Sequence, residues 1–306
     1  MPAKRPASVL SGRDTEGTKF GSPAEMWEVE AGSATGKQQW YSKGLDYWKA
    51  LPASLETVLG GYQVVSPADV RESDAFLLQH YPPAGEAAGR PLRAADVGAG
   101  VGRVTQQLLL RRFDEVDVFE PVAHYLAKAE ADIGIAPTVK GAPRVVTFTC
   151  QALEDFTPPA GRYDVIWAQA RAGPFAQPSG KPGCSPRARC SLAARRSGVW
   201  ATSPTVCAAS PRGADLLPAL TCCSDDFVRF LTRCAAGLRP EGRIFVKENN
   251  CASGFVVDKE DSSITRSDAY FQSIFPKAGL KLLKAQLQQD FPAELFAVRM
   301  YCLVPE

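Results

Sequence analysis

The sequence lacks long apolar runs, a hydrophobic leader and any Cys-x-x-Cys pair. Its apolar runs are far shorter than the ~20 residues that a membrane-spanning helix needs, so we expect no membrane association. The segment 1–20 is polar and basic and has no apolar core of a secretory signal, so we expect no export. The 9 cysteines are an odd number, and we expect free thiols in a reducing compartment. Their spacing predicts no zinc site and no other metal centre.

An excess of charge of either sign is also absent, since Lys+Arg 35 stand against Asp+Glu 33. The balance hides a basic block, because segment 171–222 has seven basic residues and one acidic residue, while the remainder has 28 basic and 32 acidic residues. The block is rich in Pro, Gly, Ser, Ala, Arg and Cys and has no helical or strand period, which predicts a disordered insertion. Its arginines lack interleaved aromatic residues, so we expect no direct binding of nucleic acid.

The rest of the chain indicates one packed domain. A hydrophobic content of 45% with 22% charged residues supports a core of ordinary size. We predict a disordered tail over 1–37 and one domain over 38–306, interrupted by 171–222. Two helices come first, over 39–51 with an aromatic face and over 67–81 with Ser66 as its N-cap. Strands are then predicted at 93–97, 115–120, 145–150, 163–168, 242–248, 280–286 and 295–303, and helices at 105–112, 122–133, 227–238 and 271–278. This alternation predicts an α/β doubly wound sheet.

A glycine-rich turn, Asp96-Val-Gly-Ala-Gly-Val-Gly-Arg103, follows the first strand and opens a helix. Its spacing is Gly-x-Gly-x-Gly, whereas dinucleotide-binding turns have Gly-x-Gly-x-x-Gly. Glu120 ends the next strand, at the sheet edge where such folds bind ligands, and its carboxylate can accept hydrogen bonds from two ribose hydroxyls. The two features favour a nucleoside ligand without a pyrophosphate, which points to S-adenosylmethionine. Leu153 and Glu154 follow the third strand, where such folds contact the adenine.

Several longer motifs resemble the alpha N-terminal protein methyltransferases, which methylate the α-amino group of proteins that begin Xaa-Pro-Lys. The resemblance covers about 38–170 and 223–305. It rests on Trp40-Tyr-Ser-Lys43, Tyr47-Trp-Lys49, Leu59-Gly-Gly-Tyr62, Asp96 to Arg103, Leu108-Leu-Leu110, Tyr163-Asp-Val-Ile-Trp167, Leu238-Arg-Pro240, Val246-Lys-Glu-Asn249, Asp258 to Ser263 and Pro292 to Phe296. It implies the Rossmann-like, seven-stranded sheet of class I methyltransferases, after an N-terminal helical extension.

The resemblance also implies roles for individual residues. The residues that align with cofactor contacts are Gly98, Arg103, Glu120, Pro121, Val122, Leu153, Glu154 and Gln169. Those that align with substrate contacts are Tyr47, Trp48, Asn249, Asp258 and Asp261, with Asn249 and Asp261 as the catalytic pair. Charge agrees with this assignment, because two carboxylates three residues apart can neutralise an α-ammonium and a lysine ammonium. Asp261 can also accept the α-ammonium proton, since only the neutral amine is a nucleophile.

The chain departs from the family pattern after Trp167-Ala-Gln169. The family continues there with a Trp and a Gly-His-Leu-Thr run, whose His is a proposed second base, whereas this chain continues with Ala170 and the insertion. The 2 histidines, His80 and His124, lie elsewhere. Codons can be chosen for Trp200 to Thr205 that encode a second peptide in a shifted reading frame. When these codons are read from the third base of the Trp200 codon, they encode Gly-His-Leu-Thr-Asp. Our hypothesis is therefore that 171–222 contains translated intron and an exon read out of frame.

Three functions remain open from the sequence. The first is an active protein N-terminal methyltransferase, and the second is a cofactor-binding pseudoenzyme or inactive isoform that lacks the catalytic segment. The third, a methyltransferase of small molecules, is disfavoured by the acidic pair and the aromatic helix. From the family and the lack of an export signal we expect a monomer in the nucleus and cytoplasm whose partners are Xaa-Pro-Lys protein tails.

Overall fold

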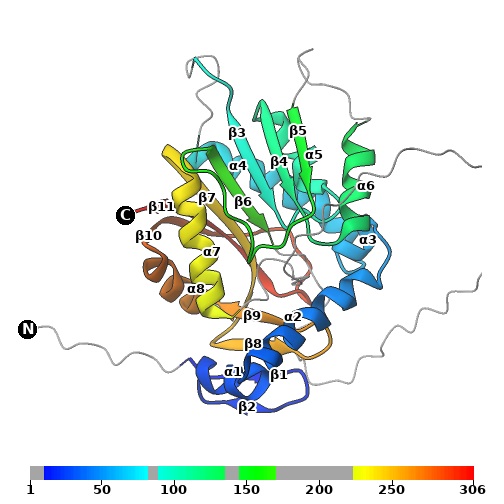
Figure 1. Cartoon of the computed structure of the whole chain (residues 1–306), viewed down its shortest axis with the longest axis vertical. Helices are drawn as coiled ribbons and strands as arrows, with labels where there is room; N and C mark the ends of the chain where they lie inside the picture. Colours follow the sequence, from blue (N-terminus) through cyan, green and yellow to red (C-terminus); the bar gives the residue numbers. More distant parts are fainter. Residues whose placement is uncertain (1–9, 82–88, 135–144, 170–222) are drawn as a thin grey trace, which may run out of the picture.

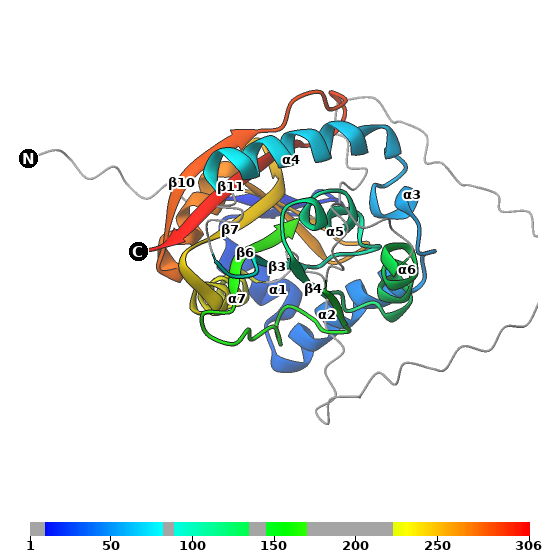
Figure 2. The same cartoon turned by 90° about the horizontal axis from the view of Figure 1, so that it is seen from above.

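A computed structural model describes residues 10–81, 89–134, 145–169 and 223–306 of the chain. A mixed β-sheet runs through the middle of the described part, and helices cover both of its faces (Figure 1, Figure 2). This arrangement confirms the predicted doubly wound α/β fold. The predicted insertion, 171–222, lies wholly outside the described residues.

Seven strands form the centre of the sheet in the order β5-β4-β3-β6-β7-β11-β10. The first five are parallel, and β11 and β10 follow by antiparallel pairing. The bounds are β3 Arg93–Val97, β4 Glu115–Phe119, β5 Val145–Thr149, β6 Tyr163–Gln169, β7 Leu238–Cys251, β10 Leu280–Leu287 and β11 Ala297–Pro305. All seven were expected from the sequence, and β7 extends further at both ends than predicted.

Among the described residues the sheet has eleven strands, the seven expected and four more. The additional strands are β1 Gly12–Asp14, β2 Lys19–Phe20, β8 Phe255–Asp258 and β9 Ser263–Ser267. They join the carboxyl end of β7, where Asn250 and Cys251 pair with β9. These strands were missed because they are too short, and too interrupted by polar turns, to show an alternating pattern.

The predicted disordered tail over 1–37 is wrong from residue 10 onward. This region forms β1, β2, helix α1 (Pro23–Ala31) and the start of α2 (Ala34–Lys49). Phe20 and Met26 are almost fully buried in the main core, and β1 pairs in parallel with β8. A few separated anchors therefore hold the segment, and they leave no periodic signal in the sequence.

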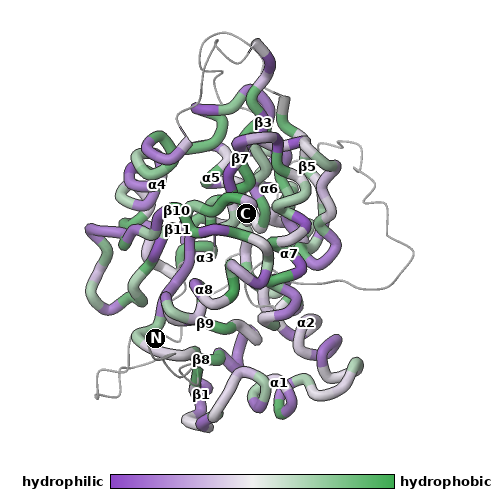
Figure 3. The backbone as a smooth tube through the Cα atoms, turned by 90° about the vertical axis from the view of Figure 1, so that its left-hand side faces the viewer, coloured by the Kyte–Doolittle hydropathy of each residue, from purple (hydrophilic) through white to green (hydrophobic). Residues whose placement is uncertain are grey.

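The sheet divides the core into two apolar clusters, one on each of its faces, and helices cover both. On one face pack α7 (Ser224–Gly237) and α8 (Asp268–Ile274), through Phe227, Phe230 and Phe271. On the other lie α4 (Ser66–His80) and α5 (Arg103–Gln107), through Phe76 and Val104. The remaining described α-helices are α3 (Leu55–Val58) and α6 (Ala123–Gly134). Hydrophilic and hydrophobic residues alternate around α4, as its colours show (Figure 3).

Several helix boundaries differ from the prediction; α2, for example, begins at Ala34 and not at residue 39. Helix α4 starts at Ser66 itself, with Val65 as its N-cap and no side-chain capping bond, because Pro67 already fits the first turn. The helix expected over 105–112 is split into α5 and a 3₁₀ turn over Leu109–Arg111.

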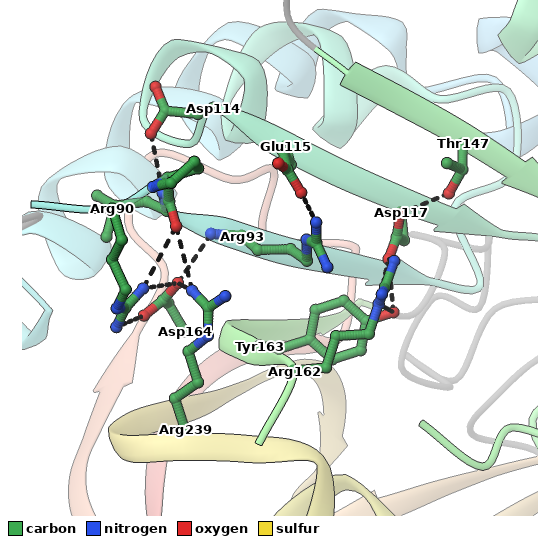
Figure 4. A network of polar contacts seen from close by, with 12 residues as sticks. Arg90, Arg93, Asp114, Glu115, Asp117, Thr147, Arg162, Tyr163, Asp164 and Arg239 are labelled. Carbon is green, nitrogen blue, oxygen red and sulfur yellow. Dashed lines mark hydrogen bonds and ion pairs between the residues drawn. The ribbon is translucent and has the colours of Figure 1, made fainter. Parts of the chain in front are cut away.

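The amino ends of the parallel strands carry a dense network of ion pairs (Figure 4). Asp164, at the start of β6, accepts hydrogen bonds from Arg90 at 2.7 and 3.0 Å and from Arg239 at 2.6 Å. The Arg93 backbone N–H adds a bond of 2.8 Å. Burial alone raises the pKa of Asp164, but these donors hold it below its ordinary value. The carboxylate is thus buried and fully neutralised at this edge.

Candidate functional site

The site lies at the opposite edge, where the carboxyl ends of the parallel strands meet. The loops after β3, β4 and β5 and the end of β6 carry all the residues predicted to contact the cofactor. In open α/β sheets this edge is the place where ligands bind.

The glycine turn after β3 depends on backbone conformations that glycine adopts easily. Gly98, Gly100 and Gly102 have φ of 79°, 61° and 75°, in the left-handed region. A Cβ on Gly102 would lie 2.8 Å from the Ala129 side chain, so the third glycine also lets the turn pack against α6. The turn brings its backbone N–H groups to the ligand edge of the sheet.

Glu120, just after β4, ties this turn to the next loop. Its carboxylate is fully buried and accepts hydrogen bonds from the Gly100 N–H at 2.7 Å and the Val122 N–H at 3.0 Å. A carboxylate at this place is suited to accept hydrogen bonds from ribose hydroxyls, and this predicted role of Glu120 stays a prediction. The side chains of Val122 and Leu153 are buried in the main core, and Pro121 lies between Glu120 and Val122. Their predicted contact with a cofactor stays a prediction.

A small pocket opens beside the glycine turn and brings three predicted residues together. Gly98, Arg103 and Gln169 line it, along with Val58 and Leu59 from the α3 region, which were not singled out as cofactor contacts. Arg103 comes from the first turn of α5, and Gln169 is the last residue of β6. The guanidinium of Arg103 is a suitable partner for the carboxylate of an amino-acid ligand.

Behind this pocket lies a buried polar cluster that sequence reasoning missed. Asp69 on α4 forms ion pairs of 2.7 Å with both Arg103 and Lys247. Burial opposes its ionisation, but the two cations lower the pKa of Asp69 to about 2. The available signal was a polar stripe at helical spacing, Ser66, Asp69 and Ser73, all three of which are buried on α4.

Glu154 follows β5, where the adenine was expected, and its buried Oε2 accepts no hydrogen bond from the described residues. Burial raises the pKa of its carboxyl to about 7, and the charges of Asp226 and Asp155 add to this effect. A buried oxygen without a partner suits a ligand that donates a hydrogen bond. Glu154 thus offers an acceptor for the adenine amino group of S-adenosylmethionine. Glu120 offers acceptors for its ribose, and Arg103 offers a cation for its carboxylate. The residues present therefore fit this cofactor.

The predicted substrate residues gather around the hairpin between β8 and β9. Asp258 ends β8 and Asp261 lies in the turn, and both are buried. Asp258 accepts a hydrogen bond from the Glu260 N–H at 2.7 Å, and Asp261 accepts one from the Ser263 N–H at 3.0 Å. Within the described ranges neither carboxylate forms an ion pair with Lys or Arg. The hairpin therefore presents two buried acids without an ion-pair partner among the described residues, although the charge of nearby Lys43 acts on Asp258.

The pKa values of the two hairpin carboxyls follow from their burial without an ion-pair partner. Burial raises the pKa of Asp261 to about 6 in spite of the Ser263 hydrogen bond, and the charge of Asp258 raises it further. Burial likewise raises the pKa of Asp258 in spite of the Lys43 charge, and its Oδ2 has no hydrogen-bond partner in the described part of the chain. An added cation at this place would restore the ionised form of both groups.

Helix α2 brings the predicted aromatic wall to these acids. Burial raises the pKa of Tyr47 to about 12, and the charges of Glu260, Asp261 and Asp258 contribute, so its ring lies beside the hairpin. The Tyr47 and Trp48 rings meet edge to face with centroids 5.2 Å apart. Lys43, one turn earlier, donates a hydrogen bond of 2.5 Å to the Lys259 carbonyl, which holds the hairpin against α2.

Asn249 occupies the same end of the molecule, on β7. It pairs with Val298 of β11, and the next residue, Asn250, is the one to which β9 joins. The side chain of Asn249 is half-buried. Of the two predicted catalytic residues, Asn249 thus lies on β7 and Asp261 in the turn before β9, the strand that pairs with β7, and their roles stay predictions.

The two histidines lie outside this arrangement. The His80 ring packs on Phe76 with centroids 4.6 Å apart, and His124 Nε2 lies 2.9 Å from the Leu51 carbonyl oxygen. The described segments contain no cluster of three or more His, Cys, Asp or Glu residues able to hold a metal ion. Within the same segments, no helix combines the length and apolar character of a membrane span.

Comparison with known proteins agrees with this geometry. Residues 36–177 and 220–304 match the sequence family described as AdoMet dependent proline di-methyltransferase, where AdoMet is S-adenosylmethionine. Alpha N-terminal protein methyltransferase 1 of Oryza sativa subsp. indica is 38% identical, over 96% of this chain and 92% of that protein. N-terminal Xaa-Pro-Lys N-methyltransferase 1 of Mus musculus is 31% identical, over 87% and 96%.

The solved structures include a SAM-dependent methyltransferase of Leishmania major with 31% identity and a TM-score of 0.73. The match covers 99% of this chain and 100% of that one. The family match leaves out 178–219, which lies within the segment that the sequence marked as foreign. This chain belongs to the family of S-adenosylmethionine-dependent proline dimethyltransferases and shares its protein N-terminal methyltransferase fold.

Proposed function

We propose that this protein transfers methyl groups from S-adenosylmethionine to the α-amino group of proteins that begin Xaa-Pro-Lys. The observation that carries the proposal is the pair Asp258 and Asp261, both buried beside Tyr47 and both without a Lys or Arg partner among the described residues. Burying two acids without a counterion is costly unless a cation arrives from outside. A peptide end with an α-ammonium and a lysine ammonium supplies two.

The substrate amine must lose a proton before it attacks. A terminal amine has a pKa of roughly 7.7–8.0, about four units above an ordinary aspartic acid. In the chain without substrate, burial raises the pKa of Asp261 to about 6, which halves this gap. Asn249 can hold the amine through its side-chain oxygen, and Tyr47 with Trp48 can exclude water from the peptide groove.

The cofactor supplies an electrophilic methyl group when it is bound. The chain supplies orientation: Glu120 for the ribose, Glu154 for the adenine and Arg103 for the carboxylate. Orientation of this kind lowers the barrier of a two-substrate reaction because translational freedom has already been lost on binding.

A second candidate is a cofactor-binding pseudoenzyme. It is favoured by one observation, the replacement of the family's Trp and Gly-His-Leu-Thr run by Ala170 and the insertion. The proposed base, Asp261, is present in either case, so the two candidates differ in turnover and not in cofactor binding.

Calorimetry and mass spectrometry separate these candidates. The full chain is titrated with S-adenosylhomocysteine and then incubated with S-adenosylmethionine and a Ser-Pro-Lys peptide. Mass gains of one methyl group or more on the free peptide, and none on its N-acetylated control, support the proposal. Cofactor binding without any gain supports the pseudoenzyme. Methylation of small amines but not of the peptide supports a small-molecule methyltransferase.

The transcript tests our explanation of the insertion. We propose that 171–222 contains translated intron and a shifted exon, and the mismatch of 178–219 with the family supports this reading. Sequencing of cDNA from Gln169 to Asp225 is expected to give a shorter product that encodes Trp and Gly-His-Leu-Thr. A cDNA with the printed segment intact and in this frame contradicts the explanation.

We further propose that the protein is a monomer, acts in the nucleus and cytoplasm, and binds neither nucleic acid nor membranes directly. These points rest on the family and on the sequence alone. Light scattering of the purified chain and imaging of a fluorescent fusion test the first two, and retention on a DNA or vesicle column would contradict the last.

A further inference from the structure

We propose that Asp69 is a positioning residue of the cofactor pocket, holding Arg103 and Gln169 in the orientation that binds S-adenosylmethionine. The inference rests on the cofactor assignment and adds a residue to it. Asp69 itself does not line the pocket, whereas Arg103 and Gln169 do. It therefore acts through them.

The contacts of Asp69 reach both pocket residues at once. Its Oδ2 forms the 2.7 Å ion pair with Arg103 Nη2, and the Gln169 amide donates to both carboxylate oxygens, at 3.1 and 3.0 Å. The Gln169 oxygen in turn accepts a hydrogen bond of 3.1 Å from the Trp167 indole. The amide orientation of Gln169 is thus fixed from both ends.

Arg103 is held in a comparable way. One of its amino groups is paired with Asp69, and the other lies 3.5 Å from the Ser66 hydroxyl, a long contact. A guanidinium has five N–H donors, so donors remain for a ligand carboxylate after Asp69 has taken one. Because the side chain is almost fully buried, its position depends on this one strong partner.

A simpler role must be separated from positioning. Lys247 is buried to 1% exposure, pairs with Asp69 at 2.7 Å and donates to Ser73 at 2.9 Å and to Gln288 at 2.6 Å. Asp69 can therefore be regarded as nothing more than the counterion that allows Lys247 to be buried. Removing Asp69 alone would leave two buried cations and destabilise the fold whichever role is correct.

A double variant removes this ambiguity. Arg103, Lys247 and Asp69 together carry a net charge of +1, and Asp69→Asn combined with Lys247→Met retains +1. The single variant Lys247→Met reduces the cluster to zero but keeps the Asp69–Arg103 pair. Net charge and orientation therefore predict opposite orders of affinity for the two variants. Ser73→Ala, which touches Lys247 but neither pocket residue, is the matched control.

The experiment measures S-adenosylhomocysteine affinity by calorimetry, with thermal unfolding of each variant to show that it is folded. Positioning predicts that the double variant binds about 10-fold or more weakly, while Lys247→Met and Ser73→Ala stay within about 3-fold of the unmodified chain. Equal affinity in the double variant and the unmodified chain overturns the inference alone. Absence of binding by the unmodified chain overturns the cofactor assignment as well.

A second variant covers the case in which the double variant does not fold. Asp69→Glu keeps the charge and moves the carboxylate by one methylene. The same loss of affinity is expected with a smaller change in melting temperature, since only orientation is altered. Affinity equal to that of the unmodified chain contradicts a positioning role.

Discussion

The two edges of the parallel sheet treat buried carboxylates in opposite ways. At the amino ends, Asp164 is surrounded by Arg90 and Arg239, and its pKa is lowered (Figure 4). At the carboxyl ends, Asp261 and Glu154 have no such partners in the described chain, and their pKa values rise to about 6 and about 7. Both edges bury acids, but Asp261 and Glu154 have no ion-pair partner among the described residues, whereas Asp164 has two.

The difference distinguishes acids that stabilise the fold from acids that are suited to bind a ligand. An acid that is paired inside the fold stabilises the native state, because removing one partner leaves a buried charge. An acid that is buried without a partner lowers stability and is retained where a ligand provides the missing charge or hydrogen bond. Asp69 lies between these cases, since it is neutralised within the fold and its partners face the ligand.

The largest expected effect is on peptide binding. Asp261→Asn removes the charge that meets the substrate ammonium, so the affinity for an Xaa-Pro-Lys peptide should fall by about 100-fold, or ~3 kcal/mol. Calorimetry in the presence of S-adenosylhomocysteine measures it. Glu260→Gln, in the same turn but exposed, is the control and should change affinity by less than about 3-fold. An equal loss in both variants would mean that the turn attracts the peptide only by its general charge.

The next effect concerns the stability of the opposite edge. Asp164→Asn leaves Arg90 and Arg239 without their anion, and the free energy of unfolding should fall by about 2–4 kcal/mol, toward the lower end because both arginines reach solvent. Urea unfolding measures it. Asp132→Asn, which breaks the exposed pair with Lys128, should cost no more than ~0.5 kcal/mol. Cofactor affinity of folded Asp164→Asn should be unchanged, and a marked loss there would contradict the division between the two edges.

The smallest effect is a gain of stability at the ligand edge. The pKa of Asp261 is about 6 in the folded chain and 3.8 ordinarily, so the folded state holds more protons between these values. Its contribution to stability therefore falls as pH rises from about 4 to about 6 and stays low above. Asp261→Asn should raise the free energy of unfolding at pH 8 by about 1–2 kcal/mol and flatten this pH dependence. A loss of stability at pH 8 would show that a counterion has been overlooked.

The sequence predicts the parts of the fold that have local causes. The strand at 93–97 and the glycine turn after it were correctly placed, because an apolar run and a turn leave local signals. The pairing of Asp69 with Lys247 was not predicted, since 178 residues separate them and only the folded sheet brings them together. The segment 10–37 was misread, because its order comes from pairing with β8 and from two buried anchors. The acidic pair was assigned from the family resemblance, and burial then gave the physical reason for its unusual pKa values.

One measurement tests the central claim, that the substrate supplies the ion-pair partner which Asp258 and Asp261 lack among the described residues. Peptide binding at pH 6 is titrated in two buffers of different ionisation enthalpy, which gives the number of protons exchanged. Because the Asp261 carboxyl is about half protonated at this pH, an arriving ammonium should release up to about half a proton from it, and Asp261→Asn should largely abolish the release. Binding without net proton release in the unmodified chain would contradict the account.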